Sequence, residues 1–209
     1  MRKISFPLYI AAFLITTFIF GAGVYIGVVI EQEAAKSIRS DMEASMDKIT
    51  EAQLIMLLEE SPSFCLFYDE ELRKALDETD VLGQELEYLE KEKNVYDPEL
   101  KKKYFTLELR SYLMAKKVRE MCGGNFSLVL YFYSHDCVGC EEQGRELTKA
   151  REMSGGRLKV FSFDGLSESS ILKALKSEHH VSTYPTMIIN EEHTLTGLMD
   201  AEQILEKAG

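Results

Sequence analysis

The chain has 209 residues, of which 45% are hydrophobic and 10% aromatic, enough for a packed domain with an extension. Its formal net charge of -11 argues against a nucleic-acid partner, because binding to a phosphate backbone needs clustered Lys and Arg. The sequence has no phosphate-binding glycine loop and no dinucleotide fingerprint, and nothing in it indicates a cofactor.

An uncharged run rich in Phe, Ile, Val and Leu extends from Ile4 to Ile30. It is longer than the roughly 20 residues that cross a bilayer core, and longer than the apolar region of about 7–15 residues in a cleaved signal peptide. We therefore expect residues 1–30 to form an N-terminal tail and a retained, single-pass transmembrane helix. Gly23 and Gly27 form a Gly-x-x-x-Gly pattern that is compatible with a homodimer, although small residues are common in such helices.

The charges that flank this run predict its orientation. Arg2, Lys3 and the terminal amine precede it, whereas the far side opens with Glu31 and Glu33. The positive-inside rule then places the N-terminus in the cytoplasm and the C-terminal domain outside the cell membrane. Disulfides persist in that compartment.

Residues 31–122 have helical periodicity and predict an all-α module. A first helix extends from Glu31 to about Glu60, and its apolar face serves either as a coiled-coil stalk or partner groove or simply as a packing face. Ser61-Pro62-Ser63 ends it, and we expect the apolar segment 64–68 to be buried. A second helix follows over residues 69–93.

A third helix has strong local signals at both ends. Asp97-Pro98 supplies an N-cap and a first-turn proline, and Gly123 follows Cys122 as a left-handed C-terminal cap. We expect Cys65 and Cys122 to form a structural disulfide across the module. Two buried free thiols are the alternative, because cysteine often serves as a small apolar filler.

The other two cysteines, Cys137 and Cys140, are three positions apart between an apolar run and a helix-favouring segment. On the first turn of a helix this spacing exposes the N-terminal sulfur to unpaired N–H groups, which favour the thiolate. The spacing is typical of a redox pair. Four cysteines nevertheless permit three pairings.

From Asn125 the pattern changes to alternating strands and helices, with Gly155-Gly156 ending the first of these helices. The expected order is strand, helix, strand, helix, strand, strand, helix. The expected elements are a strand at 126–133, a helix from Cys137 to about Met153, a strand at 158–163, a helix from Ser167 or Glu168 through Leu175, a strand at 181–189, a hairpin with 194–198 and a helix from Asp200.

This order, with Cys-x-x-Cys opening the first helix and Tyr184-Pro185-Thr186 leading a late apolar strand, resembles the thioredoxin superfamily over residues 125–209. The resemblance implies an α/β thioredoxin-like domain, βαβαββα around a central mixed sheet. It also implies that Pro185 is cis and lies against the dithiol, and that the backbone at Tyr184 and Pro185 binds an extended substrate segment.

The sequence departs from the family pattern around the motif. Asp136 replaces the usual tryptophan, and Val138-Gly139 replaces Gly-Pro. Tyr131 and Val160 stand where the family has a buried acid and a lysine.

We expect Cys137 to attack as the thiolate and Cys140 to resolve the mixed disulfide, which makes the protein a thiol–disulfide oxidoreductase for protein substrates with a separate redox partner. The direction of exchange stays open. One alternative is a binding or scaffold module with an inert disulfide. Another is a metal site that joins the two cysteines to His179, His180 or His193, although only the first two histidines are adjacent.

Overall fold

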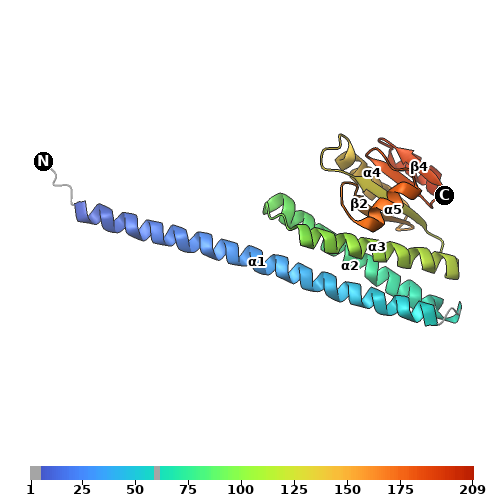
Figure 1. The fold of residues 1–209 in the computed structure, drawn as a ribbon, viewed down its shortest axis with the longest axis horizontal. Coiled ribbons are helices and arrows are strands. Elements are labelled where there is room, and N and C mark those ends of the chain that lie inside the picture. Colours follow the sequence, from blue (N-terminus) through green and yellow to red (C-terminus); the bar gives the residue numbers. More distant parts are fainter. Residues whose placement is uncertain (1–5, 59–61) are drawn as a thin grey trace.

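The structure, a computed structural model, describes residues 6–58 and 62–209. Its first element, α1 (Phe6–Leu58), is one continuous helix of 53 residues that projects far beyond the rest of the molecule (Figure 1). The sequence suggested two helices, but no proline or other break separates Ile30 from Glu31. At 1.5 Å per residue the helix is about 80 Å long.

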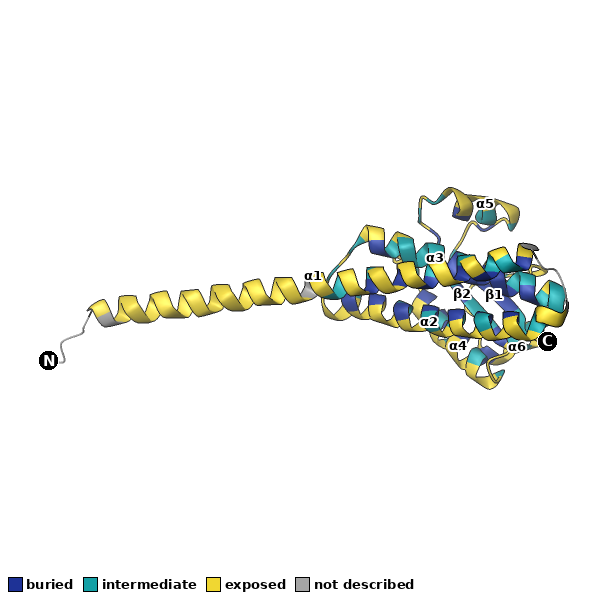
Figure 2. Cartoon of the chain, turned by 90° about the horizontal axis from the view of Figure 1, so that it is seen from below, coloured by how far each residue is buried: buried dark blue, intermediate teal, exposed yellow. Residues whose placement is uncertain are grey.

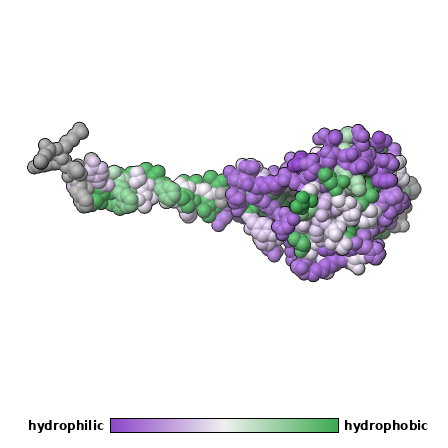
Figure 3. Space-filling model, turned by 90° about the horizontal axis from the view of Figure 1, so that it is seen from above, coloured by the Kyte–Doolittle hydropathy of each residue, from purple (hydrophilic) through white to green (hydrophobic). Residues whose placement is uncertain are grey.

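The projecting half of α1 is exposed on every side and apolar, in contrast to the polar surface of the rest (Figures 2 and 3). Within the described residues, α1 is the helix whose length and composition suffice to cross a membrane. The predicted span starts at Ile4, which lies with Arg2 and Lys3 outside the described residues. Beside Gly23 and Gly27 a Cβ would meet open space, so dimerisation of the span stays a prediction.

The second half of α1 packs with α2 (Cys65–Glu92) and α3 (Pro98–Cys122) in an up-down-up bundle (Figure 1). The 3-10 turn Pro62–Phe64 leads into α2. The apolar sides of the three helices meet along the bundle axis, with a core that includes Met42, Ile49, Met56, Leu72, Leu82, Leu86, Leu89, Leu107, Met114 and Val118.

The prediction that segment 64–68 is buried is wrong for most of its residues. Tyr68 is fully buried, but Leu66 is 87% exposed, and Phe64 and Phe67 are also exposed. The segment is helical from Cys65, so neighbouring side chains point in different directions and only some can face the core.

The predicted ends of α3 are confirmed. Asp97 Oδ1 accepts hydrogen bonds from the N–H groups of Glu99 (2.9 Å) and Leu100 (3.1 Å), and Gly123 has a left-handed φ of 66°. Gly83 does not interrupt α2. A Cβ at that position would lie 2.5 Å from the Tyr104 hydroxyl. This glycine allows α2 and α3 to approach closely.

The C-terminal part is a mixed sheet of four strands in the order β2-β1-β3-β4. Strand β1 pairs in parallel with β2, and β3 is antiparallel to both β1 and β4. The predicted element order is confirmed, although the third strand is shorter than expected. The elements are β1 (Ser127–Tyr133), α4 (Cys140–Met153), β2 (Leu158–Asp164), α5 (Ser170–Glu178), β3 (Thr186–Ile189), β4 (His193–Thr196) and α6 (Ala201–Ala208).

Side chains of β1 alternate between two cores. Leu128, Leu130 and Phe132 face the bundle, whereas Val129 and Tyr131 face α4 and α6. The bundle is therefore one of the layers that cover the sheet. Two edge-on ring pairs strengthen this contact, each with centroids 5.4 Å apart: Phe105 with Phe163, and Tyr112 with Phe161.

Candidate redox site

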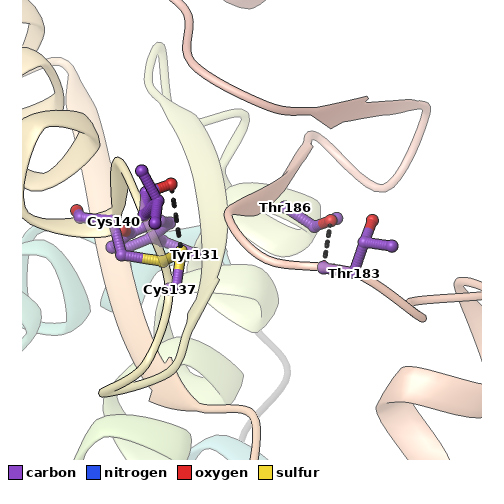
Figure 4. Close-up of a disulfide and its surroundings, with 6 residues drawn as sticks. Tyr131, Cys137, Cys140, Thr183 and Thr186 are labelled. Atoms are coloured by element: carbon purple, nitrogen blue, oxygen red, sulfur yellow. Dashed lines mark hydrogen bonds between the residues drawn. A yellow bond between two sulfur atoms is a disulfide. The ribbon is translucent and has the colours of Figure 1, made fainter.

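The Cys137–Cys140 pair follows the end of β1 and forms a disulfide, with Cα atoms 5.5 Å apart (Figure 4). Cys137 is partly exposed, whereas Cys140 is buried. A turn precedes them, in which the Cys137 N–H donates to the Ser134 carbonyl over 3.3 Å. Between the two sulfurs Val138 is 98% exposed. The pair therefore presents one accessible sulfur and one protected sulfur.

The expectation that Cys137 opens the helix is wrong. Helix α4 begins at Cys140, because Gly139 at the N-cap has a left-handed φ of 94°. Cys137 thus lies in the turn before the helix, with its carbonyl accepting from the Cys140 N–H over 3.4 Å. The backbone N–H groups of the first turn still point out of this end of α4.

Tyr131 stands beneath the pair and donates its hydroxyl to the Cys140 carbonyl over 2.6 Å (Figure 4). Burial raises the pKa of Tyr131 to about 12, so the phenol stays protonated at neutral pH and acts as a donor. Val160 on β2 packs partly buried against the same core. Neither position supplies a group that titrates near neutral pH.

The peptide bond between Tyr184 and Pro185 is cis, the isomer that the resemblance implied. Thr186 pairs with Phe132 at the end of β1, so the antiparallel register brings Pro185 to the same end of the sheet as the cysteines. Two hydrogen bonds fix this loop: Thr186 Oγ1 donates to the Thr183 carbonyl over 2.7 Å (Figure 4), and the Gly197 N–H donates to the Pro185 carbonyl over 2.9 Å.

The side chain of Tyr184 has a structural role. Its hydroxyl donates to the Gly165 carbonyl over 2.7 Å. A Cβ on residue 165 would lie only 2.2 Å from the Tyr184 ring, so glycine leaves room for the ring. The Lys176 ammonium lies 2.8 Å from the same hydroxyl. Gly165 in turn donates its N–H to the Tyr133 carbonyl over 2.7 Å. The ring therefore anchors the proline loop to the loop after β2.

Polar residues that the sequence analysis missed support the site. Gln143 is fully buried on α4, where its amide donates to the Met199 carbonyl (3.1 Å) and accepts from the Met199 N–H (2.8 Å). The Glu146 carboxylate accepts from the Ala201 N–H over 2.8 Å. In the sequence, Gln143 could have been identified as a polar residue on the side of α4 that faces the core.

The helical bundle reaches the turn before the cysteines through Lys101. The Lys101 ammonium lies 3.0 Å from Nε2 of His135 and 3.3 Å from the Glu90 carboxylate. Only 15% of the Lys101 side chain is exposed, so this lysine is largely buried between the bundle and the turn. His135 Nε2 also lies 3.8 Å from the Asp164 carboxylate at the end of β2.

Glu108 is a buried acid on α3, away from this turn. Burial raises its pKa to about 8, while hydrogen bonds from the Tyr104 hydroxyl (2.6 Å) and from the Ser162 main chain favour the charged form. Ser162 belongs to the edge strand β2. Glu108 therefore satisfies a strand-edge donor at the contact between bundle and sheet.

The predicted disulfide between Cys65 and Cys122 is present and joins the start of α2 to the end of α3. Its Cα atoms are 5.5 Å apart. Both residues are partly exposed.

The metal alternative requires several ligands gathered at one point. In residues 6–58 and 62–209 no group of three or more His, Cys, Asp or Glu is arranged to hold a metal ion. His193 pairs with Ile189 at the end of the sheet opposite the cysteines, and His179 and His180 follow the C-terminal end of α5.

The arrangement of this C-terminal sheet and its helices is consistent with a thioredoxin-like fold. No family model and no curated protein matches the chain. Solved structures similar to it include thioredoxin-2, a component of the malaria parasite protein secretion machinery, with 22% identity over 40% of this chain and 81% of that chain and a TM-score of 0.35.

Two further structures are similar at the same level. Chloroplastic thioredoxin z has 23% identity over 46% of this chain and 86% of that chain, with a TM-score of 0.36. The germline-specific thioredoxin Deadhead from Drosophila melanogaster has 18% identity over 46% of this chain and 87% of that chain, with a TM-score of 0.32. Because these scores are low, we argue function from the chemistry of the site itself.

Proposed function

We propose that this protein is a membrane-anchored thiol–disulfide oxidoreductase that exchanges disulfides with protein substrates through Cys137 and Cys140. The observation that carries the proposal is the pairing of a partly exposed sulfur with a buried one, three residues apart. Exchange requires an attacking sulfur that a substrate can reach and a resolving sulfur that is protected from other thiols.

In the reduced protein, the Cys137 thiolate attacks a substrate disulfide, forms a mixed disulfide and releases one substrate thiolate. The Cys140 thiolate then attacks Cys137 Sγ, which forms the Cys137–Cys140 disulfide and releases the second substrate thiolate. The substrate gains two electrons and the protein loses two. The reverse sequence donates the disulfide to a substrate dithiol. Tyr131 holds the Cys140 carbonyl, and thereby the start of α4, in place through both steps.

The backbone at Tyr184 is a suitable docking edge for the substrate. Among the described residues, its N–H and C=O have no main-chain partner, while the Pro185 carbonyl is already bonded to Gly197. An extended substrate segment that carries the cysteine can pair with these groups as an added strand. The exposed Val138 supplies an apolar contact beside the attacking sulfur.

Residues 4–30 supply the membrane anchor in this proposal. The apolar half of α1 is exposed rather than buried in the structure, and its length matches a bilayer core. The charge bias around the span and the two disulfides both favour an extracytoplasmic position for the sheet.

The test uses the full chain in detergent micelles and a peptide disulfide whose leaving thiol is chromogenic. We expect rapid release of the chromophore by the reduced wild type, no release above background by Cys137→Ser, and an accumulating mixed disulfide with Cys140→Ser. Double replacement of Cys65 and Cys122 by Ala is the matched control and leaves the rate unchanged. A reduced wild type that is no faster than Cys137→Ser would leave the inert-disulfide scaffold as the function.

A further inference from the structure

The redox motif lies at the end of the bundle where the apolar half of α1 emerges. Figure 1 shows the turn before α4 on the side of the sheet nearest to the projecting helix. The Cys65–Cys122 disulfide lies at the opposite end, where α3 stops. The direction of each element explains this placement: α3 leads away from the apolar segment and β1 returns toward it.

The first link between α1 and this end is the loop that joins α2 to α3. Arg39 of α1 forms an ion pair with the N-cap carboxylate of Asp97 at 2.7 Å. Val95 in the same loop lines a cavity together with Val28, a residue of the apolar run, and with Gln32. The loop therefore reaches the level at which α1 becomes apolar.

The second link is the contact between Lys101 and His135, at 3.0 Å. Lys101 is one helical turn beyond Asp97, and His135 is two residues before Cys137. Glu90 of α2 holds the same ammonium. The motif turn is thus tied to the first turns of α3, and the sheet register brings Pro185 to this end as well.

Because α1 has no break, these contacts fix the height of the motif above the apolar run. Arg39 lies nine residues after Ile30, which corresponds to roughly 14 Å along the helix axis. One further turn of α3, from Asp97 to Lys101, adds about 5 Å. Because the long Arg39 side chain spans part of this distance and Val95 lines the same cavity as Val28, the motif turn is at most roughly 20 Å from the end of the apolar segment.

A space of this height selects the substrate by shape. A compact domain of 100 residues has a radius of gyration of about 13 Å. Its diameter, at least twice this radius, therefore exceeds the height of the space. An extended segment needs only about 5 Å to the next strand and about 10 Å between sheet faces, so it fits. The open backbone at Tyr184 suits such a segment.

We propose that the substrates are cysteines in extended juxtamembrane segments of membrane-anchored partners, and that α1 sets the height at which they are attacked. This inference rests on the proposed exchange activity and on the anchor. A partner in the same bilayer meets the site at a raised effective concentration, provided that its cysteine lies at the right height.

The experiment measures how the rate depends on height in reconstituted vesicles. The probes are two synthetic single-span peptides, each with one cysteine capped as a mixed disulfide with a chromogenic aryl thiol. In the near probe the cysteine lies in a short extended segment directly after the span, and in the far probe a helical spacer of about 30 residues (~45 Å) separates them. The Cys137 thiolate attacks the peptide sulfur and releases the aryl thiolate, and Cys140 then releases the peptide thiol.

The matched variant carries a helical insertion of about 18 residues, five turns, between Gln32 and Glu33. It raises the bundle by about 27 Å without rotating it. We expect the wild type to react at least about tenfold faster with the near probe than with the far probe, and the insertion to slow the near reaction about tenfold. Cys137→Ser supplies the background rate.

A water-soluble peptide with the same mixed disulfide separates the two proposals. Equal, rapid reaction of wild type and insertion variant with this peptide, together with the loss of near-probe reaction in the variant, supports the height selection. Equal rates with both membrane probes, or a near-probe rate unchanged by the insertion, overturn it while the exchange activity stands. A wild type that does not react with the soluble peptide overturns the exchange activity and this inference with it.

Discussion

The two disulfides lie toward opposite ends of α3 and differ in the length of the loop that they close and in the exposure of their cysteines. Cys65–Cys122 joins residues 57 positions apart and closes the helical bundle, whereas Cys137–Cys140 joins residues 3 positions apart in a turn. Both Cys65 and Cys122 are partly exposed, whereas Cys140 is buried beside a partly exposed Cys137. In the proposed function, loop length and the asymmetry between the two sulfurs, more than accessibility alone, separate the structural bond from the exchangeable one.

Removal of the structural bond gives the largest expected effect on stability. In the chain-entropy relation, opening a loop of 57 residues costs about 4 kcal/mol. We expect the Cys65→Ala, Cys122→Ala double variant to lose about this much free energy of unfolding by urea denaturation in micelles.

The matched control for this loss is the double serine variant of Cys137 and Cys140, in which a very short loop is opened. Its expected loss is below about 2 kcal/mol. A larger loss from the short loop than from the long one would contradict the division of roles between the two disulfides.

The buried acid in the middle of α3 gives the next largest effect, and it concerns stability rather than exchange. The pKa of Glu108 is about 8 in the folded protein and near 4.5 in an unfolded chain, so the folded state binds this proton more tightly. The contribution of this proton to the free energy of unfolding is complete below pH 4.5 and declines as the pH rises toward 8. Glu108→Gln should therefore remove a decline in stability of at least about 1 kcal/mol over this interval.

Urea midpoints measured at several pH values test the role of Glu108. The control is Glu120→Gln, an exposed position on the same helix, which should retain the wild-type decline. If Glu108→Gln retained that decline as well, the carboxyl would be charged throughout the range and the assignment would be wrong. The exchange rate of the folded protein should be the same in both variants.

Tyr131→Phe tests the support beneath the motif. It removes the hydrogen bond from Tyr131 to the Cys140 carbonyl, which keeps its helical partner, so the change costs about 1 kcal/mol. We expect that loss in the free energy of unfolding, together with slower resolution of the mixed disulfide. Val129→Ala, a change in the same core, should affect stability alone. Equal resolution rates in the two variants would assign Tyr131 to packing only.

Lys101→Met gives the smallest expected effect. The ammonium contacts Glu90, which is partly buried, and His135, which is exposed, and such partly screened contacts are worth about 1 kcal/mol. We expect faster amide exchange in the turn 134–137 with little change in global stability. Lys101→Arg should restore most of the protection, and Lys102→Met should have no effect. Unchanged exchange in Lys101→Met would show that the bundle does not hold this turn.

Features that depend on a few neighbouring residues could be predicted from the sequence. Asp97-Pro98 and Gly123 gave the ends of α3, and Asp200 with Gln203 forms a capping box at the start of α6. The Cys-x-x-Cys spacing identified the candidate pair for the same reason. Local hydrogen bonds and backbone preferences decide all of these features.

Features that depend on distant contacts could not be predicted. The start of α4 at Cys140 is an exception, because it follows from the left-handed backbone at Gly139, a conformation that glycine adopts readily, so a local signal was present in the sequence. Lys101 resembles a solvated lysine until α2 and β1 bring Glu90 and His135 to it. Glu108 likewise becomes a buried acid only through the contact between the bundle and β2.

The central claim is that one disulfide exchanges and the other does not, and a redox titration of the full chain tests both in one sample. Glutathione buffers set the potential, free thiols are alkylated, and mass spectrometry reports each cysteine pair separately. We predict a midpoint for Cys137–Cys140 between about -120 and -270 mV, with Cys65–Cys122 still oxidised at those potentials. If Cys137–Cys140 stayed oxidised below about -300 mV, as structural disulfides do, the proposed activity would be contradicted.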